Sequence, residues 1–353
     1  MRRGHSLDVA VLAIGLGLLS GAQASAAGVT LNETGSSLLY PLFKIWAAGF
    51  VQADPRVRIV ARSTGSGAGI AQAVSGAVQI GASDAYMTDA EMKENPNVVD
   101  VPLAISAQTV NYNLPGVGRS SLRLDGPALA GIYSGSIRYW DAEPIVALNP
   151  GLRLSHDEIV PIRRSDSSGD SFIFSQYLTF STPSWESVQG FGTTIVWPSV
   201  PGELATIGNA GMIEACRRTR YSIAYIGVSY FREIAAAGLG TAVLKNQAGA
   251  FVSPTASSVT AAAAVLGPRT PPDERLSLVF APGATSYPLV SYEYAIVSTK
   301  QPNAVMAAAI REFLLWAIAT CQGNAARNLD AVRFIALPEY IRALSEAQLQ
   351  KIQ

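Results

Sequence analysis

Three short segments rich in serine, threonine and glycine stand where amphipathic helices are expected to begin. They are the ranges Glu33–Leu38, Ser63–Gly69 and Arg163–Ser171. Hydroxyl side chains at a helix start commonly cap free backbone N–H groups, which is the ordinary explanation for one such segment. Free N–H groups at the positive end of a helix dipole also bind anions, and glycine lets the backbone approach closely. Three such segments in one chain predict an anion site.

The third segment also carries a cation that can pair with an anion. Arg164 stands four residues before Ser168 and Gly169. A planar guanidinium group matches two oxygens of a tetrahedral oxyanion, although an exposed surface charge is the more ordinary place for an arginine. Asp166, two residues further on, could orient the guanidinium group. We therefore expect Arg164 to be the principal cationic group of the site.

A carboxylate is expected at the same site. Asp84 follows the apolar stretch Val78–Ser83, which predicts a strand. Ligands of open α/β sheets bind at the carboxyl ends of strands, whereas the alternative for Asp84 is an N-cap of the next turn. An ionised carboxylate only accepts hydrogen bonds, so it tolerates an anion only if that anion carries a proton. Phosphate does so at neutral pH and sulfate does not, so Asp84 favours phosphate.

Other chemistries fit the sequence less well. The run Gly65–Gly69 resembles a dinucleotide fingerprint, but Ile70 stands where the final glycine is required. The sequence has no G-x-x-x-x-G-K-[ST] loop, and Thr64 excludes a G-x-S-x-G elbow around Ser66. Once the first 26 residues are removed, His156 in a polar loop is the one remaining histidine, and we expect it at the surface. We therefore expect no catalytic residue, no metal site and no cofactor.

Strands and amphipathic helices alternate along the chain, which predicts an α/β fold with open sheets. Two longer apolar strands bracket a block of about 175 residues, large enough to form a domain of its own. The expected helices are 39–51, one opening at 69–75, 172–178 and 303–319, and the expected strands are 56–61, 78–81, 107–114 and 289–297.

The first 26 residues have the pattern of a secretory signal peptide. Arg2 and Arg3 precede an apolar run, Val9–Leu19, and Ala24-Ser25-Ala26 fits the small-x-small cleavage pattern. The run is shorter than the roughly 20 residues of a membrane span, so an uncleaved anchor is the less favoured alternative. Cleavage would leave 24 basic and 25 acidic residues, a near-neutral balance that argues against nucleic acid as a partner. We expect an exported, soluble, periplasmic protein of two domains.

The chain contains two cysteines, Cys216 and Cys321. Two cysteines do not make a disulfide framework, although export would permit them to pair. Each lies in a stretch with helical character. We therefore predict two separate buried thiols.

Several segments, in this order, resemble the phosphate-specific solute-binding proteins of ABC transporters. The resemblance runs from about residue 30 to residue 345 and implies the two-lobed periplasmic-binding-protein fold, each lobe an open sheet flanked by helices and joined to the other by two hinge strands. It assigns residues 27–107 and 289–353 to lobe one and residues 108–288 to lobe two. The segments are Glu33–Pro41, Ser63–Gly69, Gly81–Asp84, Tyr139–Asp141, Leu148–Gly151 and Arg163–Asp170.

The resemblance also implies a set of phosphate-binding residues. Asp166 would brace the arginine of this set. Position 37 holds serine where many relatives have threonine, and position 167 holds serine where many have glycine. Position 170 is threonine in some relatives, and aspartate here puts a second carboxylate near the ligand. The implied set is Ser36, Ser37, the Leu38 N–H, Ser66 and Asp84 from lobe one, with Arg164, Ser168, the Gly169 N–H and Asp170 from lobe two.

The function implied is high-affinity binding of inorganic phosphate between the lobes and its delivery to the membrane permease of a phosphate ABC transporter. The protein would act as a monomer, and closure of the lobes would complete the site and present the form that the permease recognises. Two alternatives remain open at this point. One is an exported phosphatase, and the other is a binding protein for another oxyanion such as sulfate or molybdate.

Overall fold

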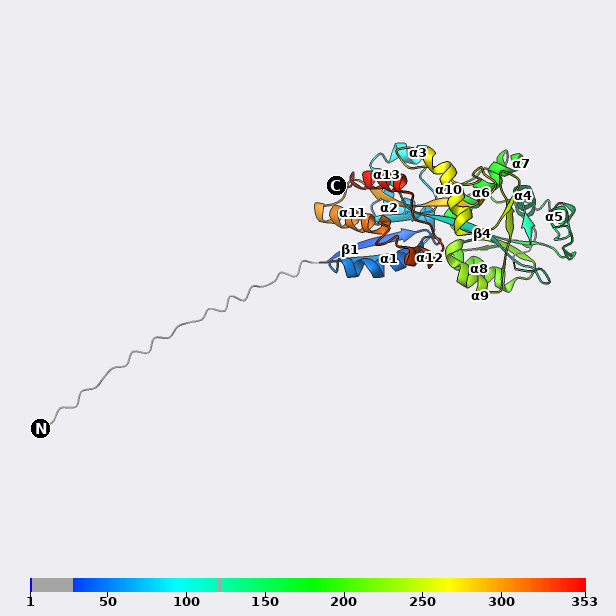
Figure 1. Ribbon diagram of the computed structural model, residues 1–353, viewed down its shortest axis with the longest axis horizontal. Coiled ribbons are helices and arrows are strands. Elements are labelled where there is room, and N and C mark those ends of the chain that lie inside the picture. The colour runs from blue at the N-terminus through cyan, green and yellow to red at the C-terminus, as the bar shows by residue number, and fades with distance from the viewer. Residues whose placement is uncertain (2–27, 120–121) are drawn as a thin grey trace.

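The computed structural model describes residue 1, residues 28–119 and residues 122–353. The predicted signal peptide, residues 1–26, falls outside this description apart from Met1. Figure 1 shows two lobes side by side, with β1, α1, α11 and α13 in one lobe and α4, α5 and α7 at the far end of the other. In the described part of the chain no helix is long and apolar enough to cross a membrane.

Lobe one is built on parallel strands that continue into an antiparallel pair. β1 lies between β2 and β3, and β12 then joins β3 to β4, giving the order β2-β1-β3-β12-β4. The β1–β2 ladder runs from Val29 opposite Val57 to Gly35 opposite Ser63. The strands are β1 (Val29–Gly35), β2 (Val57–Ser63), β3 (Ile80–Ser83), β4 (Val98–Asn113) and β12 (Val290–Ser298). The helices are α1 (Tyr40–Ala53), α2 (Ser66–Val74), α3 (Asp89–Glu94), α11 (Ala304–Ile318), α12 (Ala326–Asp330) and α13 (Glu339–Leu349).

Lobe two extends the same sheet in the order β4-β8-β6-β7, with β9 also paired to β4 and a small separate sheet β11-β10-β5. Its strands are β5 (Arg123–Leu124), β6 (Val160–Arg164), β7 (Leu204–Thr206), β8 (Ser222–Gly227), β9 (Gly240–Thr241), β10 (Val243–Lys245) and β11 (Phe251–Val252). Its helices are α4 (Gly126–Ser134), α5 (Glu143–Leu148), α6 (Gly169–Ser181), α7 (Pro183–Glu186), α8 (Gly208–Arg218) and α9 (Phe231–Ala236), with the 3-10 turn η1 (Val228–Tyr230). The helix α10 (Ala256–Leu266) and the 3-10 turn η2 (Gly267–Arg269) follow, and Gly267 lies beside Tyr292 of β12 and Tyr340 of α13.

The chain crosses between the lobes twice, and the two crossings are hydrogen-bonded to each other. β4 pairs with β12 over Val98–Ala107 and with β8 over Gln108–Asn113, so one strand belongs to both lobes. The second crossing enters β12, where the Gln108 N–H donates to the Leu289 carbonyl at 2.9 Å. The Tyr287 hydroxyl donates to the Gln108 carbonyl at 2.9 Å. The lobes therefore meet along a joined pair of segments.

The expected α/β fold of two lobes is confirmed, and the lobe boundaries at residues 107 and 288 stay a prediction. The expected elements are present with their ends shifted by a few residues, except that β4 begins nine residues before the predicted start at residue 107. His156 is exposed, as expected, and its Nδ1 lies 3.0 Å from the Asp141 carboxylate.

The prediction of two buried thiols is half wrong. Cys216 is a buried free thiol in α8, but Cys321 is exposed and lies in a turn after α11. The helical periodicity before Cys321 belongs to α11, which ends at Ile318. The chain turns there, so the cysteine does not share the buried face of that helix.

Candidate functional site

In lobe one, two of the three serine- and glycine-rich segments follow strand ends, and Asp84 follows a third strand end. β1 ends at Gly35, β2 ends at Ser63 and β3 ends at Ser83. Gly35 is paired both with Ser63 and with Ala82, so the three carboxyl ends share one edge of the lobe-one sheet. Ligands of open α/β sheets bind at this edge.

In lobe one, two serines hold the Asp84 carboxylate. The Ser36 hydroxyl donates to Asp84 Oδ1, and the Ser66 hydroxyl donates to Asp84 Oδ2 at 3.3 Å. The Asp84 N–H in turn donates to Ser66 Oγ at 3.1 Å. Ser36 also holds the turn that precedes α1, because its Oγ accepts the Leu39 N–H at 2.9 Å. All three side chains are buried, so Asp84 is a fixed, oriented acceptor and not a helix cap.

In lobe two, Arg164 is clamped between two carboxylates. It is the last residue of β6, and its side chain is 1% exposed. Its Nε donates to Asp166 Oδ1 at 2.7 Å and its Nη2 donates to Asp166 Oδ2, which is a bidentate pair. Its Nη1 donates to Asp170 Oδ2 at 2.6 Å. Ser168 caps α6 by accepting the Ser171 N–H at 3.4 Å, which places the start of that helix beside the arginine.

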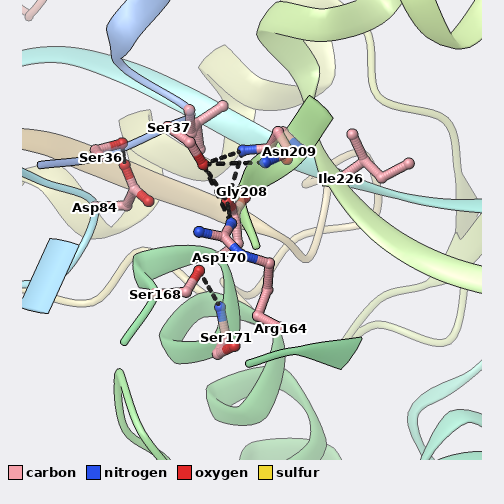
Figure 2. Close-up of polar contacts among 12 residues, drawn as sticks. Ser36, Ser37, Asp84, Arg164, Ser168, Asp170, Ser171, Gly208, Asn209 and Ile226 are labelled. Carbon is pink, nitrogen blue, oxygen red and sulfur yellow. Dashed lines mark hydrogen bonds and ion pairs between the residues drawn. The ribbon is translucent and has the colours of Figure 1, made fainter. Parts of the chain in front are cut away.

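The two halves of the site touch each other across the lobes (Figure 2). Arg164 Nη1 donates to the Ser37 hydroxyl at 3.2 Å, and the Gly67 N–H donates to the Ser167 carbonyl at 3.1 Å. A Cβ atom on Gly169 would come within 2.4 Å of both Asp84 Oδ2 and Ser66 Oγ, so only glycine permits this approach. Each predicted site residue therefore belongs to one buried cluster at the lobe contact.

Leu38 joins the cluster as an interlobe contact. Its side chain packs on Gly227, at the end of β8, where an added Cβ would meet Leu38 Cδ1 at 2.3 Å. The Leu38 carbonyl accepts the Ser229 hydroxyl at 2.7 Å. These contacts hold the loop between β1 and α1 against lobe two and fix the direction of the backbone at Leu38.

Asn209 is a member of the cluster that the sequence argument missed. It lies in the first turn of α8, and its Nδ2 donates to Ser37 Oγ at 2.8 Å and to Asp170 Oδ2 at 2.7 Å. Its Oδ1 accepts the Gly227 N–H at 2.7 Å, which fixes the orientation of the amide. Gly208-Asn209 at a helix start is the same kind of signal as the three predicted segments, and searching for a fourth would have found it.

Gln108 and Glu293 were also missed, and they come from the two crossing strands. Gln108 Nε2 donates to Asp170 Oδ1 at 3.1 Å and to the Asp170 carbonyl at 2.8 Å. Both Asp170 oxygens therefore already accept hydrogen bonds from protein groups. Glu293 is fully buried, and its Oε1 accepts the Ser106 hydroxyl. Both residues lie within apolar strands, where sequence patterns favour packing roles.

Burial governs the protonation of this cluster. Burial raises the pKa of Asp84 to about 6, with a further contribution from the nearby Asp170 carboxylate. Burial also raises the pKa of Asp170, against the opposing effects of Arg164, Gln108 and Asn209. Burial alone would lower the pKa of Arg164, but Asp166 and Asp170 raise it above its ordinary value, so Arg164 stays charged.

Arg163, the neighbour of Arg164, takes no part in the cluster. Its Nη2 forms an ion pair with Glu203 Oε1 at 3.0 Å, on a partly exposed face of lobe two. Adjacent residues of a strand point to opposite faces of the sheet, which separates the two arginines. Arg164 faces the lobe contact and Arg163 faces away from it.

Two lobes that close on a buried polar cluster form the architecture of a solute-binding protein. The family model described as the PBP superfamily domain matches residues 21–320. The phosphate-binding protein PstS of Methanocaldococcus jannaschii is 30% identical over 331 residues, covering 88% of this chain and 83% of that protein. PstS of Haemophilus influenzae is 31% identical over 317 residues, covering 90% and 91%. The chain belongs to the PBP superfamily and, within it, to the family of these phosphate-binding proteins.

Solved structures support the fold. A high-affinity periplasmic phosphate-binding protein (PfluDING), solved with phosphate, superposes with a TM-score of 0.71 at 21% identity, covering 90% of this chain and 93% of that one. A phosphate-binding protein from Stenotrophomonas maltophilia gives a TM-score of 0.68 at 22% identity, covering 91% and 94%. The two-lobed arrangement is therefore shared with proteins of low sequence identity.

Proposed function

We propose that this protein binds inorganic phosphate between its lobes and delivers it to the membrane permease of a phosphate ABC transporter. The chain belongs to the phosphate-binding family, and one observation of its own structure carries the proposal. A buried carboxylate, Asp84, is held by two serines directly against the helix start that carries Gly169, with the buried Arg164 in the same cluster. Cation, helix N-terminus and proton acceptor together suit a protonated tetrahedral oxyanion.

Each group has a defined part in binding. Arg164 and the N–H groups of Leu38 and Gly169 would donate to phosphate oxygens, and the hydroxyls of Ser36, Ser37, Ser66 and Ser168 would complete the shell. Asp84 would accept the hydrogen bond of a P–OH group. Hydrogen bonds to charged groups contribute about 1.5–3 kcal/mol each, and about 8 kcal/mol corresponds to micromolar affinity. A few well-made contacts therefore suffice for tight binding of a fully desolvated anion.

Transport needs the lobes to open and close. β4 and the segment leading into β12 are the two connections at which they would hinge. We propose that the protein works as a monomer in the periplasm, exported by a signal peptide at residues 1–26, and that it is a carrier and not an enzyme. Small-angle scattering should show a smaller radius of gyration with phosphate than without it, and an unchanged radius would count against a closing cleft.

Calorimetry on one sample with phosphate, arsenate and sulfate tests the proposed function. We expect tight, saturable binding of phosphate and no heat of binding with sulfate. A chromogenic phosphomonoester assayed at high protein concentration should show no turnover, and a turnover that survives repurification would favour the exported phosphatase instead. Preferred binding of sulfate or molybdate would contradict the proposal.

A further inference from the structure

A third carboxyl group lies behind the site, and the function proposed above gives it no task. Glu293 on β12 is fully buried and lies next to Tyr294, which pairs with Ser83 of β3, so its side chain stands beside Asp84 at the end of that strand. The two carboxyl groups act on each other's pKa, which places them close enough for a hydrogen bond if one of them carries a proton. The register of the β12–β4 ladder shifts between Glu293 and Tyr294. Such irregularities re-aim a side chain, and they are frequent beside functional sites. Two residues earlier on the same strand, the Ser291 hydroxyl donates to the Asp84 carbonyl at 3.0 Å.

A hydrogen bond between the carboxyl groups of Glu293 and Asp84 requires that one of them carries a proton. Two ionised carboxylates only accept hydrogen bonds, so a bond between them needs one of them protonated. Glu293 Oε1 already accepts the Ser106 hydroxyl, while Oε2 has no donor among the described residues. An unpartnered carboxylate oxygen buried away from water is costly, and a proton on Oε2 donated to Asp84 removes that cost.

The electrostatic surroundings place the proton on Glu293. The titratable groups that act on it are Asp84 and Asp170, both negative when ionised, and its hydroxyl partner is Ser106. Burial raises the pKa of Glu293 well above its ordinary value, and these two carboxyl groups raise it further. Asp84, in contrast, is held by Ser36 and lies within the field of Arg164, both of which lower its pKa. Glu293 is therefore the donor and Asp84 the acceptor.

Counting acceptor positions on Asp84 shows what this arrangement does. A carboxylate has about four lone-pair positions. Ser36 occupies one, Ser66 occupies a second, and the proton of Glu293 would occupy a third. One position then remains, and Gly169 of lobe two lies directly against Oδ2. The Ser36 and Ser66 hydroxyls carry one proton each, so they can donate to phosphate only by releasing Asp84. The proton of Glu293 would then still hold Asp84 in place and leave its other acceptor positions to the P–OH group.

We propose that Glu293 is a positioning residue that stays protonated and donates its hydrogen bond to Asp84, so that Asp84 remains an ionised acceptor aimed at the P–OH group of phosphate. The proposal rests on the proposed function for the identity of the ligand. The proton on Glu293 is a property of the protein alone and can be measured without phosphate.

Infrared difference spectroscopy tests the proton directly. The spectrum of wild type minus that of Glu293→Gln, taken at neutral pH without ligand, should contain the C=O stretch of a protonated carboxylic acid. Glu274→Gln is the matched control, because it removes a buried acid that lies away from the site. Glu274 is a buried acid in another place, with Oε1 bonded to the Ser345 hydroxyl at 2.8 Å, and its pKa is raised by burial to about 8. A carboxylate band at position 293 in place of the acid band would overturn the proposal.

Phosphate calorimetry on the same proteins tests the consequence. Glu293→Leu fills the space but donates nothing to Asp84, and it should weaken phosphate binding by roughly 10- to 100-fold. Glu293→Gln, whose amide can donate to Asp84, should recover most of that loss, whereas Glu274→Gln should bind as wild type does. A folded Glu293→Leu protein with wild-type affinity would refute the positioning role. Failure of wild type to bind phosphate would instead refute the proposed function, and the infrared band would still decide the protonation of Glu293.

Discussion

The two lobes contribute opposite chemistry to one site. Lobe one supplies the oriented carboxylate of Asp84 and its serine partners, whereas lobe two supplies the buried guanidinium group of Arg164 and the start of α6. In the proposed function, lobe two would therefore attract the charge of the anion and lobe one would recognise its proton. Neither half alone would separate phosphate from other oxyanions, because selectivity requires both to contact the same ligand.

The largest effect should be the exclusion of sulfate, which depends on lobe one. Sulfate has no proton for Asp84, and sites built on buried hydrogen-bonding groups reject ligands that lack the partner by about 10⁴–10⁵-fold. Sulfate should therefore fail to displace phosphate at neutral pH even in large excess. Below about pH 6 Asp84 becomes protonated, since its pKa is raised to about 6, and the discrimination should narrow. Competition calorimetry at both pH values checks this, and effective sulfate competition at neutral pH would contradict the role of Asp84.

Removal of the cation from lobe two should come next. Arg164→Ala leaves Asp166 and Asp170 without their buried partner and should weaken phosphate binding by about 2–5 kcal/mol. Arg163→Ala is the matched control, because that side chain pairs with Glu203 away from the lobe contact. Titration calorimetry on both variants gives the comparison. Equal losses at the two positions would show that the assignment of Arg164 is unsupported.

Asn209 joins the two lobes and should have an intermediate effect. Asn209→Ala removes the donor shared by Ser37 and Asp170 and leaves the Gly227 N–H without its acceptor, so phosphate affinity should fall by about 1–3 kcal/mol. Asn149 is a control of the same type, because its amide bonds to Arg123 and Ile145 within lobe two. Asn149→Ala should lower the melting temperature without changing affinity. If only stability changes in both variants, Asn209 is a structural residue.

The smallest effect should come from Asp170. This residue places a carboxylate in lobe two, so the two lobes are not fully divided into a cationic one and an anionic one. Phosphate affinity should fall at alkaline pH as the two-proton form disappears, since the dianion carries one proton, which can satisfy Asp84 but not Asp170 as well. Asp170→Thr should flatten this dependence by a few-fold and no more, because both Asp170 oxygens already accept bonds from Arg164, Asn209 and Gln108. Coincident pH profiles of the two proteins would show that Asp170 does not act on the ligand.

Much of the fold could be predicted because local periodicity reports burial. The helix α1 and the strand β12 lie almost where their apolar spacing places them. The early part of β4 was missed because Val98–Ser106 is buried on both faces and contains Pro102, so no alternation marks it as a strand. Its partner is β12, nearly 200 residues further along the chain, and pairing over that separation leaves no local signal.

The residues of the site also fall into predictable and unpredictable ones. Residues in hydroxyl- and glycine-rich helix starts were predicted, because the local sequence is shaped by free N–H groups. Gln108 and Glu293 could not be predicted, because a single polar residue in an apolar strand is compatible with many roles. Their contacts with Asp170 and Ser106 depend on how the crossing strands meet, which only the tertiary structure defines. Asn209 is an intermediate case. The start of its helix can be recognised in the sequence, but its contacts with Ser37 and Asp170 cannot.

The sharing of β4 between the lobes has a consequence for how the molecule denatures. Residues 98–107 of this strand are hydrogen-bonded to β12 and residues 108–113 to β8. Unfolding of either lobe therefore removes hydrogen-bond partners from a strand that also belongs to the other lobe. The two halves should therefore lose structure in one calorimetric transition, although the chain is long enough for two independent ones. Amide protons along the whole of β4 should exchange with solvent only when the entire molecule opens.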